Sequence, residues 1–434
     1  MTTRLLNWST ASDAERLEAL ERPALKSDAS TREIVAGIID DVRSRGDAAL
    51  LEITERIDGV RLETLAVTDE EKAWAEQQLT PEAIDAIDLA ISNVRAFHEA
   101  QKPGLVEVET MPGVRCERLW HPLESVGLYV PAGTAPLPSA AVMLCVPAAI
   151  AGVRDKVLCT PPRPDGRADP AVIVAATRAG VDTIIKIGGA QAVAAMAYGT
   201  ETVPKTLKIF GPGNAWVTAA KGLVSADAKG AAIDLPAGPS EVLVIADGDA
   251  SVEFVASDLL SQAEHGADSQ VVLVTTSQSL ADAVQIELER QLQELSRADI
   301  AREALSHSRL IVVDSLSDAV SVSNRYAPEH LILQTQNARD LVADLRNAGS
   351  IFVGRWTPES VGDYCSGTNH VLPTYGFARN YSGLGLDQFI RYTTVQELDR
   401  EGLENLGKAV VELAGLEGLD AHAAAVTRRL ESQA

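Results

Sequence analysis

The chain has 434 residues, of which 46% are hydrophobic and 23% charged, and its formal net charge at pH 7 is −23. These values are typical of a soluble protein with two or three domains, each large enough to bury an apolar core. The acidic balance argues against nucleic acid and anionic membranes as partners, because binding to either depends on clustered lysine and arginine.

Several local features favour a cytoplasmic protein. The first residues, MTTRLLNWSTASDAER, turn polar too early for a secretory signal. The apolar run from Ala140 to Ala151 is too short to span a membrane and contains Pro147. The cysteines are scattered, which predicts neither a disulfide framework nor a thiolate zinc site; they are Cys116, Cys145, Cys159 and Cys365.

Helical periodicity dominates the first part of the chain. Apolar residues recur at helical spacing in Thr31–Val42 and again in Pro81–Phe97. Residues 1–124 are therefore predicted to form a helical N-terminal layer, which we expect to pack on the second of two α/β domains.

From Ser125 onward, short β-rich runs alternate with segments of helical length. One series of strands is predicted in VGLYV, KVLC, TIIKI, LKIF and AIDL, and a second in EVLVIA, QVVLVT, RLIVV, HLILQ and SIFVG. This alternation is typical of parallel strands joined by right-handed crossovers. The prediction is α/β, with two doubly wound, incomplete Rossmann-like domains in residues 125–236 and 237–375, joined near Pro236–Pro239.

Residues 376–434 form a tail that is too small for a core of its own and should dock elsewhere. Helices are predicted in Thr394–Ala414 and Leu419–Leu430, the second with Asp420 as its N-cap. His422 borders the apolar stripe of the second stretch. That position is typical of an interface histidine and, taken alone, assigns no function.

The segment SQAEHGADSQ places Gln262 and His265 three residues apart at the end of a predicted helix that Gly266 stops. On a helix this spacing puts both side chains on one face, about 5–6 Å apart at Cβ, which is compatible with two ligands of one metal ion. The alternative is a solvated helix face with no ligand.

Two further segments contain groups that could carry chemistry. Glu329 and His330 follow Pro328 at the start of a strand, where neighbouring side chains point in opposite directions and should not form a hydrogen-bonded dyad. They could flank a ligand or form only a surface turn. The loop RWTPESVGDYCSGTNHVLPT contains Asp363, whose carboxylate fits beside Gln262 and His265 in a nitrogen and oxygen ligand set for zinc.

Glycine-bearing turns at Gly188–Val193 and Phe210–Val217 each connect a predicted strand to a helix, where free backbone N–H groups can hold a phosphate. The pattern GxGxxG occurs nowhere in the chain. A nicotinamide cofactor therefore does not follow from these residues by themselves.

Eight segments in order closely resemble histidinol dehydrogenases: YVPAGTAPLPS, IGGAQAVAAMAYGT, GPGNAWVTAAK, IDLPAGPSEVLV, LLSQAEHGADSQ, APEHLIL, VGDYCSGTNHVLPT and EGLDAHAAAV. The resemblance spans nearly the whole chain. It implies a cytoplasmic, zinc-dependent homodimer with shared active sites that oxidises L-histidinol through histidinal to L-histidine with two NAD+. The tail, residues 376–434, would be exchanged across the dimer.

The resemblance also implies roles for individual residues. Zinc would be bound by Gln262, His265, Asp363 and the partner subunit's His422. Glu329 would activate water, and His330 would take the hydroxyl proton. Substrate would contact Ser240, His330, His370, Glu417 and the zinc ligands, while NAD would contact Tyr129, Gln191 and Asn214.

Two positions depart from the family pattern. Ala132–Gly133 stands where the family commonly has two glycines, and Ala132 would be strained if its φ were positive. Leu235 replaces a methionine, which is a conservative apolar change.

Two other functions remain open. Cys365 could be the nucleophile of a thiol aldehyde dehydrogenase, although no neighbouring residue ensures a lowered thiol pKa. Alternatively, the zinc could only tie the tail into a non-catalytic dimer.

Overall fold

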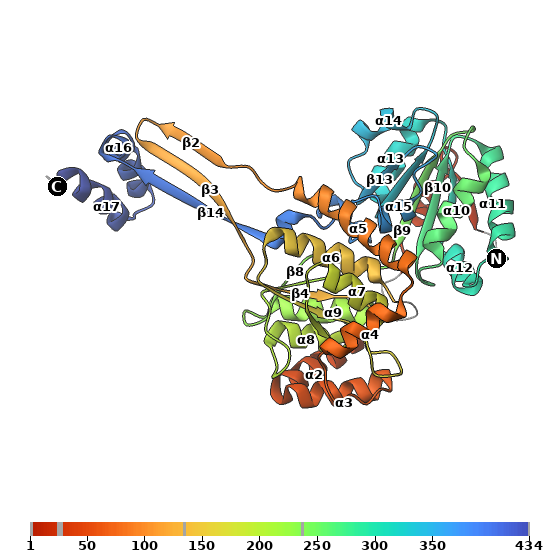
Figure 1. The fold of residues 1–434 in the computed structure, drawn as a ribbon. Coiled ribbons are helices and arrows are strands. Elements are labelled where there is room, and N and C mark those ends of the chain that lie inside the picture. The colour runs from red at the N-terminus through yellow and green to blue at the C-terminus, as the bar shows by residue number, and fades with distance from the viewer. Residues whose placement is uncertain (1–2, 24–28, 133–135, 236–237, 433–434) are drawn as a thin grey trace.

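The computed structural model describes residues 3–23, 29–132, 136–235 and 238–432. Figure 1 shows two α/β bodies side by side and an arm that projects from them. The first body comprises residues 29–105, 123–132 and 136–235, the second residues 3–23 and 238–370, and the arm residues 106–122 and 390–432. The predicted mixed α/β class with parallel sheets is confirmed.

The first body is built on a parallel sheet of order β6-β5-β4-β7-β8. Its strands are β4 (Ser125–Tyr129), β5 (Asp155–Cys159), β6 (Thr183–Ile185), β7 (Lys208–Phe210) and β8 (Ala232–Ile233). Its crossover helices are α6 (Pro138–Ala151), α7 (Pro170–Arg178), α8 (Gly189–Tyr198) and α9 (Ala215–Ala226). The strand order reverses between β4 and β7, and a doubly wound sheet binds its ligand outside the carboxyl ends at such a point.

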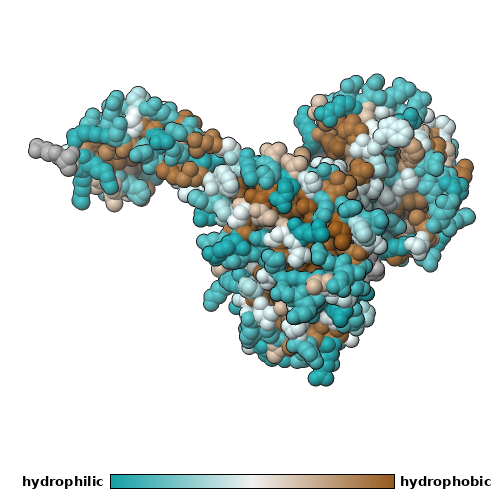
Figure 2. Space-filling view, viewed as in Figure 1, coloured by the Kyte–Doolittle hydropathy of each residue, from teal (hydrophilic) through white to brown (hydrophobic). Residues whose placement is uncertain are grey.

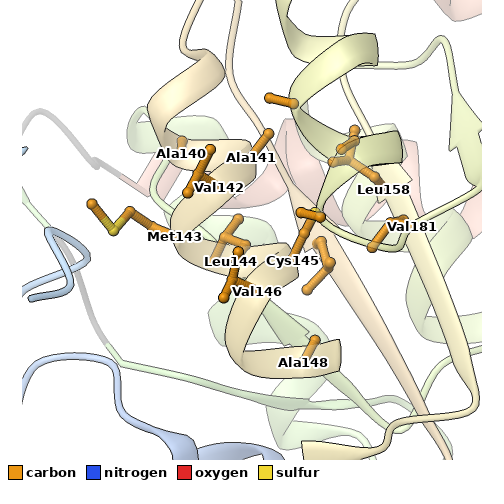
Figure 3. Packing of buried hydrophobic residues seen from close by; sticks show 14 of the residues in the cluster. Ala140, Ala141, Val142, Met143, Leu144, Cys145, Val146, Ala148, Leu158 and Val181 are labelled. Atoms are coloured by element: carbon orange, nitrogen blue, oxygen red, sulfur yellow. The ribbon is translucent and has the colours of Figure 1, made fainter. Parts of the chain in front are cut away.

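Helix α6 lies in the middle of the larger core of this body, as Figure 3 shows. Its residues from Ala140 to Ala148 are all buried. A helix that is hydrophobic on every side is stable only inside a protein, so this apolar run is a core helix. Leu235 is buried in the same core, as expected for an apolar replacement.

The predicted N-terminal helical layer packs on the first body, so its assignment to the second α/β domain is wrong. The helices are α2 (Ala29–Arg45), α3 (Asp47–Asp58), α4 (Asp69–Gln78) and α5 (Pro81–Glu99). α2 and α3 contact α8, whereas α4 and α5 contact α7 on the opposite face of the sheet. An apolar stripe on a helix indicates that this face is buried, but it does not identify the segment that buries it. That segment is known only from the tertiary structure.

The second body repeats the same strand order, with an additional edge strand: β1-β11-β10-β9-β12-β13. Its strands are β1 (Arg4–Asn7), β9 (Glu241–Ala246), β10 (Gln270–Thr275), β11 (Arg309–Val312), β12 (His330–Gln334) and β13 (Ser350–Val353). Its helices are α1 (Asp13–Ala19), α10 (Val252–Ala263), α11 (Gln278–Leu292), α12 (Ala298–Ser306), α13 (Leu316–Tyr326), α14 (Ala338–Leu341) and α15 (Glu359–Tyr364). Only the first residues of the predicted N-terminal layer, in β1 and α1, belong to this body.

The arm consists of an antiparallel sheet, β14-β3-β2, followed by two helices. Its elements are β2 (Val106–Met111), β3 (Val114–Pro122), β14 (Ile390–Leu398), α16 (Arg400–Leu416) and α17 (Asp420–Glu431). The prediction of helix from Thr394 is wrong up to Leu398, because this stretch pairs with β3, far away in the sequence. Leu419, not Asp420, stands at the N-cap position of α17.

A connecting segment, residues 371–389, joins the second body to the arm along the first body. It contains two short 3-10 helices, Phe377–Arg379 and Leu386–Phe389, and Phe389 stacks on Phe210 with ring centroids 4.2 Å apart. Among the described residues, no helix is both long and apolar enough to cross a membrane. The domain boundaries at 125, 237 and 376 stay a prediction, and Pro236 in the predicted junction lies outside the described residues.

Candidate functional site

The site lies where the carboxyl edge of the first sheet meets the amino edge of the second. A cavity of about 460 Å³ is lined from both bodies, by residues that include Pro131, Asn214, Ser240, Gln262, His265, Glu329, His330, Asp363 and His370. In the second body most of these groups precede or begin a strand, whereas Asp363 and His370 follow β13. At the carboxyl edge of the second sheet, Asp247 accepts a hydrogen bond from the backbone N–H of Gln336 at 2.7 Å. This carboxylate is therefore already paired within the protein.

Three neighbouring side chains could hold a metal ion, and two of them, His265 and Asp363, line this cavity. The ligand atoms of His265, Glu359 and Asp363 all lie within 4.8 Å of one another. His265 follows the end of α10 at Ala263, and Asp363 lies on α15. Gln262, in the last turn of α10, faces the same group through Glu359. The structure therefore brings together three of the four predicted zinc ligands: Gln262, His265 and Asp363.

Glu359 is a site residue that the sequence analysis missed. It is buried and accepts a hydrogen bond from Ser261 Oγ at 2.9 Å. With the Gln262 amide turned so that its nitrogen faces Glu359, the carboxylate also accepts from that nitrogen at 2.9 and 3.1 Å. Burial raises the pKa of Glu359 to about 8, and the nearby charge of Asp363 adds to the rise. Glu359 and Asp363 are four residues apart. Predicting one turn of helix in this loop would have placed their carboxylates next to each other.

Glu329 and His330 both line the 460 Å³ cavity, so the prediction that their side chains point in opposite directions is wrong. Glu329 stands before the first residue of β12 and is free of the strand's alternation. Their closest atoms, His330 Nδ1 and Glu329 Oε2, are 3.6 Å apart, which is too long for a hydrogen bond. Glu329 Oε2 instead accepts from the backbone N–H of Glu241 at 2.9 Å.

The two ring nitrogens of His330 have different surroundings. Nδ1 lies 3.1 Å from the carbonyl oxygen of Glu241. Nε2 is 3.4 Å from Asp363 Oδ1, yet it is buried without a hydrogen-bond partner among the described residues. Burial works against the imidazolium, but Glu329, Asp363 and Glu359 outweigh it and raise the pKa of His330 well above its usual value.

A buried ion pair supports the Glu329 and His330 positions from behind. Arg22 forms a two-point contact with Glu241, through Nε to Oε1 and through Nη2 to Oε2 at 2.8 Å. The Glu241 carboxylate also accepts from the backbone N–H of Tyr375 at 2.7 Å. The backbone of Glu241 bonds to both Glu329 and His330. By fixing the Glu241 side chain, Arg22 therefore helps to position both of these residues. No motif in the sequence indicated this pair.

A larger cavity of about 1190 Å³ opens from the carboxyl edge of the first sheet, and the predicted cofactor residues Tyr129, Gln191 and Asn214 all line it. Gln191 is buried, and its Nε2 has no hydrogen-bond partner within the part of the chain that the structure describes. The Tyr129 hydroxyl accepts from the Gly189 backbone N–H at 3.0 Å, and burial raises its pKa to about 12. Asn214 caps α9 through its side-chain oxygen.

Glycine is required where the first sheet passes Tyr129. Gly211 has a φ of +121°, and a Cβ atom there would lie 2.1 Å from the carbonyl oxygen of Tyr129. Its N–H donates to Asp234 at 2.8 Å, and its carbonyl accepts from Lys221 Nζ at 2.9 Å. In contrast, Ala132 is not strained, because the described non-glycine residues with positive φ are Ala327 and Tyr375; Gly133 lies outside the described residues.

Two predicted site residues line neither cavity. Glu417 and His422 lie at the far end of the arm, where α17 contacts α16 (Figure 1). Both side chains are exposed. Within one chain the structure therefore leaves the predicted ligand set without His422 and the predicted substrate set without Glu417.

Comparisons with known proteins give one family. A family model described as Histidinol dehydrogenase matches residues 20–430. The chain is 56% identical to the histidinol dehydrogenase of Xanthomonas euvesicatoria over 98% of this chain and 99% of that protein. It is also 56% identical to that of Vibrio parahaemolyticus, over 99% and 98%. A crystal structure of histidinol dehydrogenase from Elizabethkingia anophelis matches with a TM-score of 0.95 and 45% identity, over 99% of this chain and 98% of that one.

Proposed function

The chain belongs to the histidinol dehydrogenase family of NAD-dependent oxidoreductases, and on that premise we propose that it oxidises L-histidinol through histidinal to L-histidine, with one zinc ion and two NAD+. The observation that carries this proposal is that a metal-donor group, a histidine and a large cavity lie next to one another. The donor group of His265, Glu359 and Asp363 lies beside His330. The cavity that His330 lines shares Pro131 and Asn214 with the larger cavity of the first body.

The donor set fits zinc. Imidazole nitrogen and carboxylate oxygen are ligands that zinc accepts. When the Gln262 amide nitrogen donates to Glu359, its amide oxygen is turned away from that carboxylate and becomes available as a ligand. Glu359 then serves to orient Gln262, as hydrogen-bonded partners of metal ligands generally do. Bound zinc would hold the imidazole and amine of L-histidinol and act as a Lewis acid toward its alcohol oxygen.

His330 is suited to take the proton of the substrate hydroxyl. His330 can act as a base only as the neutral ring, and a metal cation bound beside it would offset the carboxylate charges that raise its pKa. With Nδ1 donating to the Glu241 carbonyl, the proton-accepting atom of that neutral ring is Nε2, which lacks a hydrogen-bond partner among the described residues and faces Asp363. As this proton moved to Nε2, the carbinol C–H bond would break and its electron pair would leave as hydride, for which NAD+ held in the larger cavity would be the acceptor in each oxidation.

Glu329 is suited to assist the second oxidation. Conversion of an aldehyde to an acid requires addition of water to the carbonyl carbon, and a carboxylate can take a proton from that water. Glu329 Oε2 is held by the Glu241 N–H, and Glu329 lines the cavity beside His330. General-base assistance of this kind is typically worth about 10²–10⁴-fold in rate.

We propose that the arm is exchanged between two subunits, so that the partner subunit's His422 completes the zinc ligands and the partner's Glu417 contacts substrate. Apolar side chains on the arm lie open: Leu413 and Leu416 are 60% and 84% exposed. Figure 2 shows hydrophobic residues at the surface of the arm. An exposed apolar surface of this kind favours contact with another chain. A cytoplasmic location stays a prediction.

The central experiment counts products. Purified protein with zinc, NAD+ and L-histidinol is expected to form two NADH and one L-histidine per histidinol. Glu329→Gln should slow oxidation of added histidinal far more than the first hydride transfer, measured in a single turnover. A Glu329→Gln protein that oxidises histidinal at the normal rate would remove this residue from its assigned role.

The exchanged arm is tested by metal content. His422→Asn is expected to lose most of its bound zinc, as measured by atomic absorption, while remaining a dimer by light scattering. Full zinc occupancy in this variant would contradict the shared site. A dimer that loses its assembly on chelation and yields no NADH from histidinol would instead favour a purely structural zinc.

A further inference from the structure

The larger cavity contains an acidic group that none of the proposed roles uses. Asp58, the last residue of α3, lines this cavity together with Tyr129, Gln191 and Pro161. Its Oδ2 atom is buried and has no hydrogen-bond partner among the described residues. Burial raises the pKa of this carboxyl group.

Asp58 stands at an electrostatically unfavourable position in the fold. A carboxylate in the last turn of a helix faces the negative end of the helix dipole. The described ion pairs include none that involves Asp58, although Arg56 is nearby in sequence and lines the same cavity. A buried polar oxygen without a partner costs free energy, so this carboxylate is expected to have a ligand.

The position of Asp58 in the cavity indicates which part of a dinucleotide it would meet. Pro131 and Asn214 line both cavities, so the nicotinamide end must lie near them to reach the metal-donor group. α2 and α3 contribute Ile34, Ile38 and Asp58 to the larger cavity only. That part is left for the adenosine half.

The sheet itself does not supply the acidic residue that usually binds the adenosine ribose. In a doubly wound dinucleotide domain, this Asp or Glu follows the glycine-rich turn by about 20 residues and accepts from the ribose hydroxyls. Here the second strand, β5, ends at Cys159 and is followed by Thr160, Pro161 and Pro162. Pro161 and Pro162 line the cavity together with Asp58, so a carboxylate reaches this place from α3.

We propose that Asp58 accepts hydrogen bonds from the adenosine ribose hydroxyls of NAD and excludes NADP, whose ribose carries a phosphate at the 2′ position. This inference rests on the proposed place of NAD in the larger cavity. The two ligands differ at one group: a hydroxyl donates to a carboxylate, whereas a phosphate dianion is repelled by it and leaves Asp58 unpaired.

The test measures equilibrium binding of NAD+ and of NADP+ to the protein by isothermal titration calorimetry. Asp58→Asn is nearly isosteric and should weaken NAD+ binding on the order of tenfold or more, since a hydrogen bond to a charged group is lost. NADP+ binding should not weaken, so the preference for NAD+ falls by at least the same factor. Asp85→Asn, an exposed acidic residue on α5, is the matched control and should change neither ligand.

Two further measurements separate the possible failures. The melting temperature of ligand-free Asp58→Asn should equal or exceed that of the wild type, which shows that the variant folds. Gln191→Leu tests the place of NAD itself. If Gln191→Leu weakens NAD+ binding and Asp58→Asn leaves binding and preference unchanged, the role of Asp58 is refuted. If Gln191→Leu also has no effect, NAD does not occupy this cavity and the proposed arrangement fails with it.

Discussion

Asp258 offers a direct test of how burial acts in the second body. It lies on α10, one turn before Gln262, and is 5% exposed. Its carboxylate accepts one hydrogen bond, from Gln334 Nε2 at 3.0 Å, and no described cation pairs with it. Burial raises the pKa of Asp258 from 3.8 to about 6, although the Gln334 bond acts in the opposite direction.

The sign of the effect follows from the raised pKa. Between about pH 4 and pH 6 the folded protein keeps this proton while the unfolded chain releases it, so stability falls as pH rises through this window. A shift of about 2 units corresponds to about 3 kcal/mol, of which roughly half is lost by pH 5 and nearly all by pH 8. Below about pH 4 the group costs nothing.

Asp258→Asn removes this charge and keeps an acceptor oxygen for Gln334. We expect the variant to be more stable than the wild type at pH 8 by about 1–3 kcal/mol, and by about half as much at pH 5. Thermal unfolding at pH 5, 6, 7 and 8 measures the difference, at about 2–4 °C per kcal/mol for a body of this size. Asp314→Asn, at an exposed position of the same body, should show no such trend.

A pH-independent gain in Asp258→Asn would refute the reasoning, because it would come from packing or hydrogen bonding and not from the titration of the carboxyl group. Destabilisation at pH 8 would also refute it. That result would mean that the charged carboxylate has a favourable partner in the folded protein.

Three other substitutions test separate parts of the structure. Arg22→Gln leaves the Glu241 carboxylate buried without its cation and should cost about 3–5 kcal/mol of stability and lower kcat for histidinol; unchanged melting and unchanged kcat would contradict the support that we assign to this pair. Cys365→Ser should still form L-histidine at a rate close to that of the wild type, whereas complete loss of acid formation would favour a thiol mechanism. Ala327 is buried with a φ of 56°, so Ala327→Gly should increase the free energy of unfolding by about 1 kcal/mol and raise the melting temperature. A clear decrease in melting temperature would show that packing of the Ala327 methyl group stabilises the fold by more than the backbone strain costs.

Local sequence patterns were enough to predict the α/β alternation and much of the metal-donor group. Strands such as EVLVIA and QVVLVT are continuous apolar runs bounded by polar turns, which is the pattern of strands buried on both faces. Gln262 and His265 were found because helical spacing is a local property. Asp363 was found because it stands in a long loop rich in small polar residues.

Tertiary structure alone decided the contacts between distant segments. The apolar stripes in α2 and α5 indicate that these helices are buried but not which body buries them. β14 becomes a strand only because it pairs with β3, more than 250 residues earlier in the chain. Arg22 meets Glu241 across 219 residues. Asp58 enters the larger cavity from a helix outside the sheet. Local patterns record how much surface a segment must bury and how its side chains are spaced, but the choice of partner depends on packing that forms only when the whole chain has folded.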